Sequence, residues 1–178
     1  MRQTLFLFSL LLFAGALVAQ DEKESNDEAF RRHKVSLAIT HTFVPTTINS
    51  NGDKTYLSLA SWGLDYDFRI NSLWGAGLHS DLVIQDFEYE DNDVVRTRVK
   101  PLAMAAVATR KLGKHFTVLA GGGAEFSRGE ETLALIRFGA DYGWELPDDW
   151  EVSFSVVTDF KIGAYNALVF GFSLGKAF

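Results

Sequence analysis

The sequence contains no cysteine and only three prolines in 178 residues. The lack of cysteine excludes disulfides, thiolate metal sites, cysteine nucleophiles and a lipid anchor attached to a cysteine. The scarcity of proline favours regular secondary structure. Basic residues are also few, because 17 Lys and Arg stand against 23 Asp and Glu, which gives a formal charge of −6. We therefore expect no nucleic-acid partner, since phosphate backbones are bound by basic surfaces.

Long apolar runs are absent except near the N-terminus. Arg2 is followed by an apolar stretch over 5–13 and by small residues up to Ala19. This order of charge, apolar stretch and small residues is typical of a signal peptide, which we assign to residues 1–19. Cleavage after Ala16 is the alternative to cleavage after Ala19. An uncleaved anchor is less favoured, because a spanning helix needs roughly 20 apolar residues.

The remainder of the chain divides into a short tail and one domain. Residues 20–32 are mostly charged, and we expect a disordered periplasmic tail there. Residues 33–178 contain segments in which large apolar side chains alternate with small or polar ones, a pattern that predicts β-strands. Eight such segments can be distinguished, at 34–43, 61–69, 74–85, 95–110, 116–126, 136–145, 150–160 and 168–178.

The last segment indicates the surroundings of these strands. One of its faces carries Leu168, Phe170, Phe172, Leu174 and Phe178, and the other face is small or polar. A large apolar face backed by a small one is expected where lipid lies on one side and a narrow lumen on the other. The predicted fold is all-β: a closed antiparallel up-and-down eight-stranded transmembrane β-barrel.

The connections on one side of the predicted strands are all short, whereas the other side has two longer, polar ones and a tight one near 162–164. Short turns are predicted at 71–72, 112–113 and 147–149, and these we place on the periplasmic side. The opposite connections, at 45–54, 88–95, 127–132 and 162–164, are then external. Aromatic residues near the short turns are predicted to form an interfacial girdle at the lipid headgroups. They are Trp74, Phe116, Trp144 and Trp150.

Turn positions combined with the alternation predict which charges meet in the lumen. A two-residue turn at 112–113 sets Lys100 opposite Glu125. The turns near Asp148 and Ser72 set two further pairs opposite each other, Arg137 with Asp159 and Asp65 with His79. Segment 95–110 is ambiguous, because its second half is apolar on both faces. We place its even positions in the lumen, which leaves Val99, Pro101, Ala103, Ala105 and Val107 facing lipid.

With its signal peptide, eight strands, girdles and terminal aromatic strand, the chain resembles the small eight-stranded outer-membrane β-barrels of Gram-negative bacteria, of the OmpA-transmembrane or OmpX type. The resemblance covers about residues 34–178. It implies a location in the outer membrane after signal-peptide cleavage, outer-membrane lipid and lipopolysaccharide as surroundings, and a monomer. It also implies that Phe172, Leu174 and Phe178 form the signal read by the barrel-assembly machinery.

Motifs for catalysis or for cofactors are missing from the sequence. The four histidines are scattered without metal-ligand spacing, and the glycines at 121–123 lack the features of a phosphate-binding loop. We therefore expect no cofactor, no metal and no enzymatic activity. The favoured function is a structural or interaction barrel with a side-chain-filled, charge-paired lumen and no large open pore.

Two alternative functions stay open at the level of sequence. The first is a lipid-modifying outer-membrane enzyme, for which His41 and Ser80 are the candidate base and nucleophile, although they lie on strands that are not neighbours. The second is a secreted, soluble, lipocalin-like carrier of a small apolar ligand. In that case the large side chains would point into the barrel.

Overall fold

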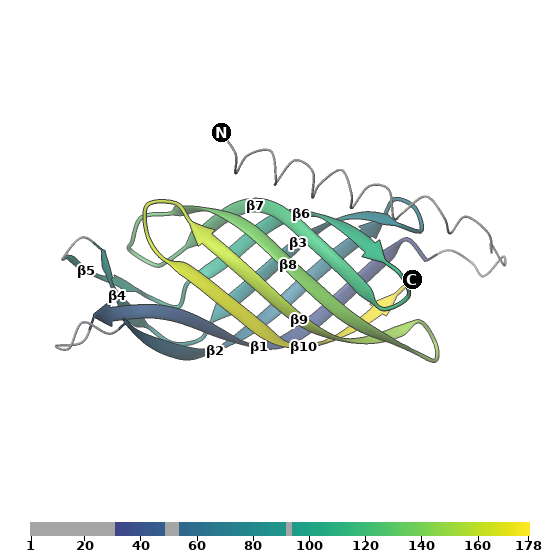
Figure 1. Cartoon of the computed structure of the whole chain (residues 1–178), viewed down its shortest axis with the longest axis horizontal. Coiled ribbons are helices and arrows are strands. Elements are labelled where there is room, and N and C mark those ends of the chain that lie inside the picture. Colours follow the sequence, from purple (N-terminus) through teal and green to yellow (C-terminus); the bar gives the residue numbers. More distant parts are fainter. Residues whose placement is uncertain (1–30, 49–53, 92–93) are drawn as a thin grey trace, which may run out of the picture. The chain divides into compact units, whose positions relative to one another are not determined.

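The chain folds into a closed antiparallel barrel of eight strands, with a small hairpin inserted at one end (Figure 1). This structure is a computed structural model that describes residues 31–48, 54–91 and 94–178. The expected signal peptide, residues 20–30 of the expected tail and the chain at 49–53 and 92–93 lie outside the described residues. No helix in the described ranges is long and apolar enough to cross a membrane. The strands are β1 (His33–Ile48), β2 (Lys54–Arg69), β3 (Trp74–Val83), β4 (Phe87–Asp91), β5 (Val94–Arg98), β6 (Leu102–Leu112), β7 (Phe116–Phe126), β8 (Leu133–Leu146), β9 (Trp150–Lys161) and β10 (Asn166–Ala177).

Neighbouring barrel strands follow the order β1-β10-β9-β8-β7-β6-β3-β2, and β1 also pairs with β2 to close the ring. His33 and Phe178 exchange backbone hydrogen bonds of 2.9 and 3.3 Å, so the described N-terminal residues and the C-terminus meet at one end of the barrel. We call this the terminal end. The short turns at 70–73, 113–115 and 147–149 lie there too, and the β4–β5 hairpin projects from the opposite, hairpin end.

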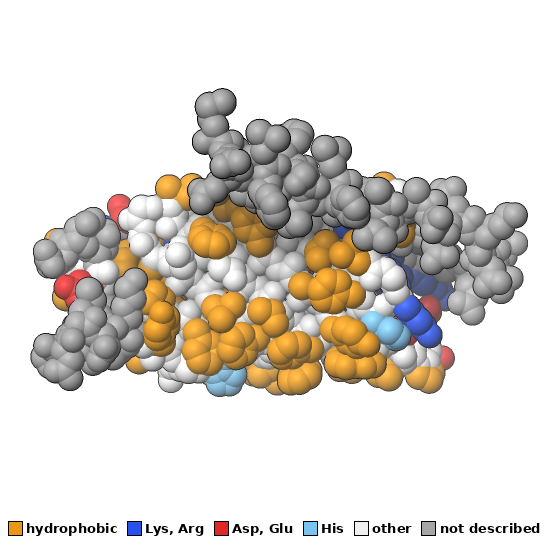
Figure 2. All heavy atoms as spheres, in the orientation of Figure 1, with side chains coloured by type: hydrophobic (Ala, Val, Ile, Leu, Met, Phe, Trp, Pro, Cys, Tyr) orange, Lys and Arg blue, Asp and Glu red, His pale blue; other side chains and the backbone are white. Residues whose placement is uncertain are grey.

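Large side chains point out of the barrel and small ones point in. On β10, Phe172 is 59% exposed and the next residue, Ser173, is 9% exposed. Figure 2 shows apolar side chains spread along the barrel wall on the face in view. The prediction of a closed eight-stranded barrel with outward-facing large residues is confirmed. A lipocalin-like arrangement, with these residues turned inward, is not what the chain adopts.

Two glycines of β7 are required by the close approach of β6. A Cβ atom on Gly121 would collide with the carbonyl of Ala106, and one on Gly123 would collide with the carbonyl of Met104. Gly122 points outward, where the nearest atom to an added Cβ would be 3.4 Å away. The inward glycines therefore let the wall curve tightly between these strands, whereas the outward one is not required for packing.

The register of the paired strands confirms two of the three charge pairs that were predicted in the lumen. Arg137 lies opposite Asp159, and Asp65 lies opposite His79. The third pair is wrong, because Glu125 lies opposite Ala103 and not Lys100. The turn between β6 and β7 contains three residues, 113–115, and begins with Gly113 at a φ of 77°.

The predicted strand 95–110 is two strands separated by a bend. Lys100 has a φ of 40° and is followed by Pro101, and the segment before it pairs with β4 outside the barrel. The bend reverses the alternation, so Ala103, Ala105 and Val107 are buried in the lumen and do not face lipid. Pro101 is buried as well, contrary to the prediction. The even positions that follow the bend point outward.

The connection predicted at 45–54 is shorter than expected, because β1 extends to Ile48 and β2 begins at Lys54. Pairing between β1 and β10 ends at Phe43 and Leu168, so Pro45 lies where β1 has only β2 as its neighbour. A register shift follows between Pro45 and Thr47. Proline is tolerated at such an edge position with a bulge, because no second neighbour needs its missing N–H.

Candidate functional site

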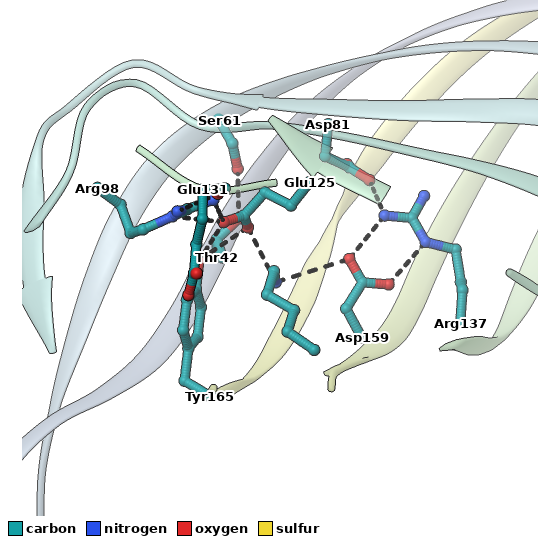
Figure 3. A network of polar contacts seen from close by, with 10 residues as sticks. Thr42, Ser61, Asp81, Arg98, Glu125, Glu131, Arg137, Asp159 and Tyr165 are labelled. Atoms are coloured by element: carbon teal, nitrogen blue, oxygen red, sulfur yellow. Dashed lines mark hydrogen bonds and ion pairs between the residues drawn. The ribbon is translucent and has the colours of Figure 1, made fainter. Parts of the chain in front are cut away.

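Six charged side chains, three of each sign, fill the lumen toward the hairpin end, and we call them the outer cluster (Figure 3). Arg137 of β8 donates two hydrogen bonds of 2.7 and 2.8 Å to Asp159 of β9. The same guanidinium lies 2.7 Å from Asp81 of β3. Balanced charge is what a buried cluster requires, because an unpaired buried charge is very costly. The members are Asp81, Arg98, Glu125, Arg137, Asp159 and Lys161.

Glu125 of β7 connects the two halves of the outer cluster. Its carboxylate lies 2.8 Å from Nη2 of Arg98 and 3.3 Å from Nζ of Lys161. The hydroxyl of Tyr165, in the turn between β9 and β10, donates to it over 2.7 Å. Burial, followed by the charge of Glu125, raises the pKa of the Tyr165 phenol, which keeps the hydroxyl protonated as a donor. Every oxygen of this buried carboxylate therefore has a partner from another element.

An apolar cap covers the outer cluster. Phe87 and Tyr89 of β4 turn inward and pack on the ring of Tyr165, with ring centroids 5.5 and 4.6 Å apart. Beneath them, a cavity of only about 10 Å³ separates Phe87 from the charged groups. That volume is about the size of one water-sized probe, so the described side chains of the cap and the outer cluster fill this part of the lumen. The members of the cap are Val44, Leu59, Val83, Phe87, Tyr89, Leu133, Tyr165 and Ala167.

A second group of charges, the inner cluster, lies toward the terminal end. Lys34 of β1 lies 2.9 Å from Glu151 and 3.7 Å from Asp67, and Nε2 of His79 lies 3.0 Å from Asp67. Cavities of about 80 Å³ at the mouth and about 40 Å³ deeper in the lumen adjoin these residues. Both are polar and large enough for water. The members are Lys34, Asp65, Asp67, Arg69, His79, Asp141 and Glu151.

His79 and Asp65 are opposite each other in register, yet their side chains have other partners. The His79 ring contacts Asp67, two residues along β2, and Asp65 accepts the backbone N–H of Ser80 over 3.1 Å. In a sheet, diagonal neighbours two residues apart are within reach of long side chains. The predicted register is therefore right, and the predicted contact between these two side chains is not formed.

The remaining predicted residues lie away from both clusters. Lys100 is exposed at the hairpin end, where its backbone N–H donates to Asp86 over 3.1 Å. The girdle residues Trp74, Phe116, Trp144 and Trp150 are all exposed on the outward face, on strands that adjoin the turns of the terminal end. On β10, Phe172 and Leu174 point outward, and Phe178 stacks on the His33 ring at a centroid distance of 5.6 Å.

The sequence analysis missed several members of the two clusters. Asp67, Asp81 and Glu151 occupy small-face positions of the expected strands, so the alternation placed them in the lumen without giving them partners. Lys161 continues the face of Asp159 by two residues, which is a signal that could have been used. Arg98 was placed in the lumen with the even positions of 95–110 but was given no partner, and no comparable signal marked Tyr165, which lies in the turn between β9 and β10.

The two residues of the candidate catalytic pair, His41 and Ser80, have other partners in the structure. Ser80 donates its hydroxyl to the carbonyl of Leu64, and His41 instead has Ser58 at 3.3 Å from Nδ1. His41 and Ser58 both lie on the outward face, where the barrel strands carry no Asp or Glu at any described position. The described residues also contain no group of three or more acidic or histidine side chains arranged to hold a metal ion.

No protein-family model matches the sequence, and no curated protein matches it. Solved structures do match. Ail, the attachment invasion locus protein of Yersinia pestis, aligns with a TM-score of 0.55 and 12% identity over 83% of this chain and 99% of that chain. Ail in complex with the heparin analogue sucrose octasulfate aligns over the same shares with a TM-score of 0.58 and 16% identity. Neisserial surface protein A aligns with a TM-score of 0.52 and 8% identity over 82% of this chain and 97% of that one. The chain therefore has the fold of the small eight-stranded outer-membrane β-barrels.

Proposed function

We propose that this chain is an integral outer-membrane β-barrel protein of a Gram-negative bacterium, with a structural or interaction role and no large open pore. The observation that carries the proposal is the outward face of the barrel. Large apolar side chains such as Leu37, Phe138 and Phe172 are more than half exposed there, and no described outward position of the barrel strands is acidic. Such a surface is stable against hydrocarbon and unfavourable in water.

The filled lumen supports the second half of the proposal. An eight-stranded barrel encloses little more than its own side chains. Here the outer cluster and the apolar cap occupy the hairpin end, where the adjoining cavity measures about 10 Å³. The buried Arg137–Asp159 and Arg98–Glu125 ion pairs occupy the lumen at this end. We therefore expect a plugged barrel that presents its hairpin end to partners.

Heat-modifiable gel mobility of the native protein in an outer-membrane fraction tests the membrane assignment. A folded species that changes mobility only on boiling supports a closed, detergent-resistant barrel. Recovery in the soluble periplasm without such a change overturns the proposal. Planar-bilayer recording of the purified protein tests the plug: we expect no steady conductance steps, and stable open channels would contradict the plugged lumen.

Biogenesis and surroundings belong to the same proposal. After removal of the signal peptide, the assembly machinery would read the outward aromatic pattern of β10, with Phe172, Leu174 and Phe178. The mature protein would be a monomer surrounded by phospholipid and lipopolysaccharide. Phe178→Ala should lower the amount of folded protein in the outer membrane of cells and leave refolding in detergent nearly unchanged. Equal loss in both settings would assign Phe178 to stability alone.

The contact between His41 and Ser58 is the observation that favours a lipid-modifying enzyme as the second candidate. A base–nucleophile pair needs a third group to orient the base, and no carboxylate shares their face of the described strands. We therefore propose a non-enzymatic role. Release of fatty acid from lipopolysaccharide or phospholipid by the purified protein, abolished by Ser58→Ala, would replace this proposal with the enzymatic one.

A further inference from the structure

Arg110 is an arginine on the lipid-facing side of the wall, near the terminal end. It lies on the outward face of β6, opposite Trp74 of β3 and Val118 of β7. Its guanidinium carbon is 4.9 Å from the centre of the Trp74 ring, which is a favourable cation–π distance. Tryptophan at such a position marks the level of the lipid headgroups. The guanidinium is thus held where headgroup and hydrocarbon meet.

The Nε–H group of Arg110 has no acceptor within the protein. In the described part of the chain, two buried side-chain nitrogens lack a hydrogen bond, Nη2 of Arg98 and Nε of Arg110. The first is accounted for, because Nη2 of Arg98 lies 2.8 Å from Glu125 in an ion pair. The second stays unsatisfied, and a buried donor without an acceptor is unfavourable. Because Nε is buried, an acceptor from outside the protein has to be bound by the Nη groups, which are not among these buried nitrogens.

No acid on the same face can compensate the charge of Arg110. The described outward positions of all eight barrel strands contain neither Asp nor Glu. Other outward basic groups do have a partner within the chain. Lys176 donates to the carbonyl of Asp148, and the His33 ring lies 2.8 Å from the hydroxyl of Tyr66. Arg110 therefore differs from the comparable groups of the girdle.

The wall beside Arg110 has room for acyl chains. Moving from Arg110 toward the middle of the barrel, five outward positions carry small side chains or none, and Leu78 of β3 and Val118 of β7 border them. The five positions are Ala76, Ala106, Ala108, Ala120 and Gly122, and all five are exposed. The large residues that cover other parts of the wall are missing at these positions. An apolar area of small side chains therefore adjoins a guanidinium that has no acidic partner.

We propose that Arg110 binds the phosphate of a glycerophospholipid in the leaflet at the terminal end, with the acyl chains lying over the area of small side chains. A guanidinium presents paired N–H donors that match two phosphate oxygens, so the Nη groups of Arg110, which are not among the unsatisfied buried nitrogens, can bind a phosphate that compensates the charge. The inference rests on the proposed membrane location. It adds a specific lipid site to a barrel whose general surroundings are lipid.

The first test measures lipid retention. Protein folded in phosphate-free detergent is titrated with short-chain phosphatidylglycerol and examined by native mass spectrometry. We expect Arg110→Gln to weaken retention about tenfold, the loss of one charge-assisted contact. Lys176→Gln is the matched control, because it removes an outward cation beside Trp150 that already has a partner, and it should change retention less than about twofold. Equal retention by Arg110→Gln and the unsubstituted protein overturns the proposal.

The second test uses the unsubstituted protein, so it holds even if Arg110→Gln does not fold. The ¹⁵N–¹H signal of the Arg110 Nε group should shift on adding phosphatidylglycerol and stay unchanged with diacylglycerol of the same chains. An unmoved signal contradicts the proposal, and an equal shift with inorganic phosphate alone would replace the lipid site with a free-anion site. Heat-modifiable mobility of the same samples reports on the barrel independently. Loss of that property would count against the proposed function and not against the lipid site.

Discussion

Arg137 and Asp159 face each other across β8 and β9, both 1% exposed, and share two parallel hydrogen bonds. This geometry fixes the register of the two strands, because a slip by one residue would turn both charges toward lipid. It also makes each residue dependent on the other, since both side chains are buried. The contact with Asp81 extends this dependence to the opposite wall of the barrel.

We expect Arg137→Met to lower the free energy of unfolding by about 3–5 kcal/mol, because two buried carboxylates lose their cation. Urea unfolding of the protein in lipid vesicles, followed by tryptophan fluorescence, measures this change. In an Asp159→Asn background the same substitution should lower the free energy of unfolding by less, because one of the two carboxylate charges that would lose their cation has already been removed. Additive costs would mean that the two side chains do not stabilise each other.

Glu125 pairs with Arg98 and not with the predicted Lys100, and this gives a second prediction. Arg98→Met should destabilise the barrel by about 3 kcal/mol, because a buried ion pair is broken on one side. Lys100→Ala, two residues away and exposed, should stay within about 0.5 kcal/mol of the unsubstituted protein. The same unfolding measurement separates them. The reverse order of effects would restore the pairing of Lys100 with Glu125 and contradict the observed register.

The glycines of β7 provide a third prediction with a built-in control. Gly123→Ala places a methyl group against the carbonyl of Met104, and we expect a loss of about 1–3 kcal/mol from the strain of separating β6 and β7. Gly122→Ala faces outward and should be neutral or slightly stabilising. The two variants differ by one position only. Comparable unfolding midpoints for both would show that the inward glycine is not required for close approach.

The apolar cap gives a fourth prediction. Phe87→Ala should loosen the β4–β5 hairpin locally and leave the barrel closed, because the hairpin is a small unit held mainly by this cap. Limited proteolysis should then cut between 84 and 101 several times faster, while the barrel fragment keeps its heat-modifiable mobility. Val95→Ala is the control, since Val95 is 59% exposed on β5. Equal cutting rates in the two variants would show that Phe87 does not hold the hairpin.

Alternation and turn placement were sufficient to predict the barrel and part of its lumen. Each strand alone is a weak signal, but the same large-out, small-in pattern recurs along the barrel strands, and all the turns at the terminal end are short. This is why the sequence alone predicts that Arg137 lies opposite Asp159. The argument works for neighbouring strands, since their register follows directly from the turn that joins them.

The bend at Lys100 could not be predicted in the same way. Arg96, Arg98 and Lys100 alternate as a strand would, and a lysine with positive φ has no sequence signal of the kind that glycine gives. Pro101 was the available sign, since the residue before a proline is conformationally restricted. Contacts across the lumen could not be predicted from the sequence either. Glu125 meets Lys161 and Tyr165 from a strand and a turn that are not adjacent to β7, and turn geometry says nothing about such pairs.

The β4–β5 hairpin is inserted between β3 and β6, and its length does not affect how these two strands pair in the barrel wall. Leu82 and Leu102 are paired neighbours, and Val83 donates to the carbonyl of Pro101 over 3.0 Å, so the chain leaves and re-enters the rim at adjacent points. Residues added at the hairpin tip, between Asp91 and Val94, would leave every barrel register as it is. With the cap retained below, the hairpin becomes a natural splice point at which a guest peptide could be displayed on the side of the membrane opposite the termini.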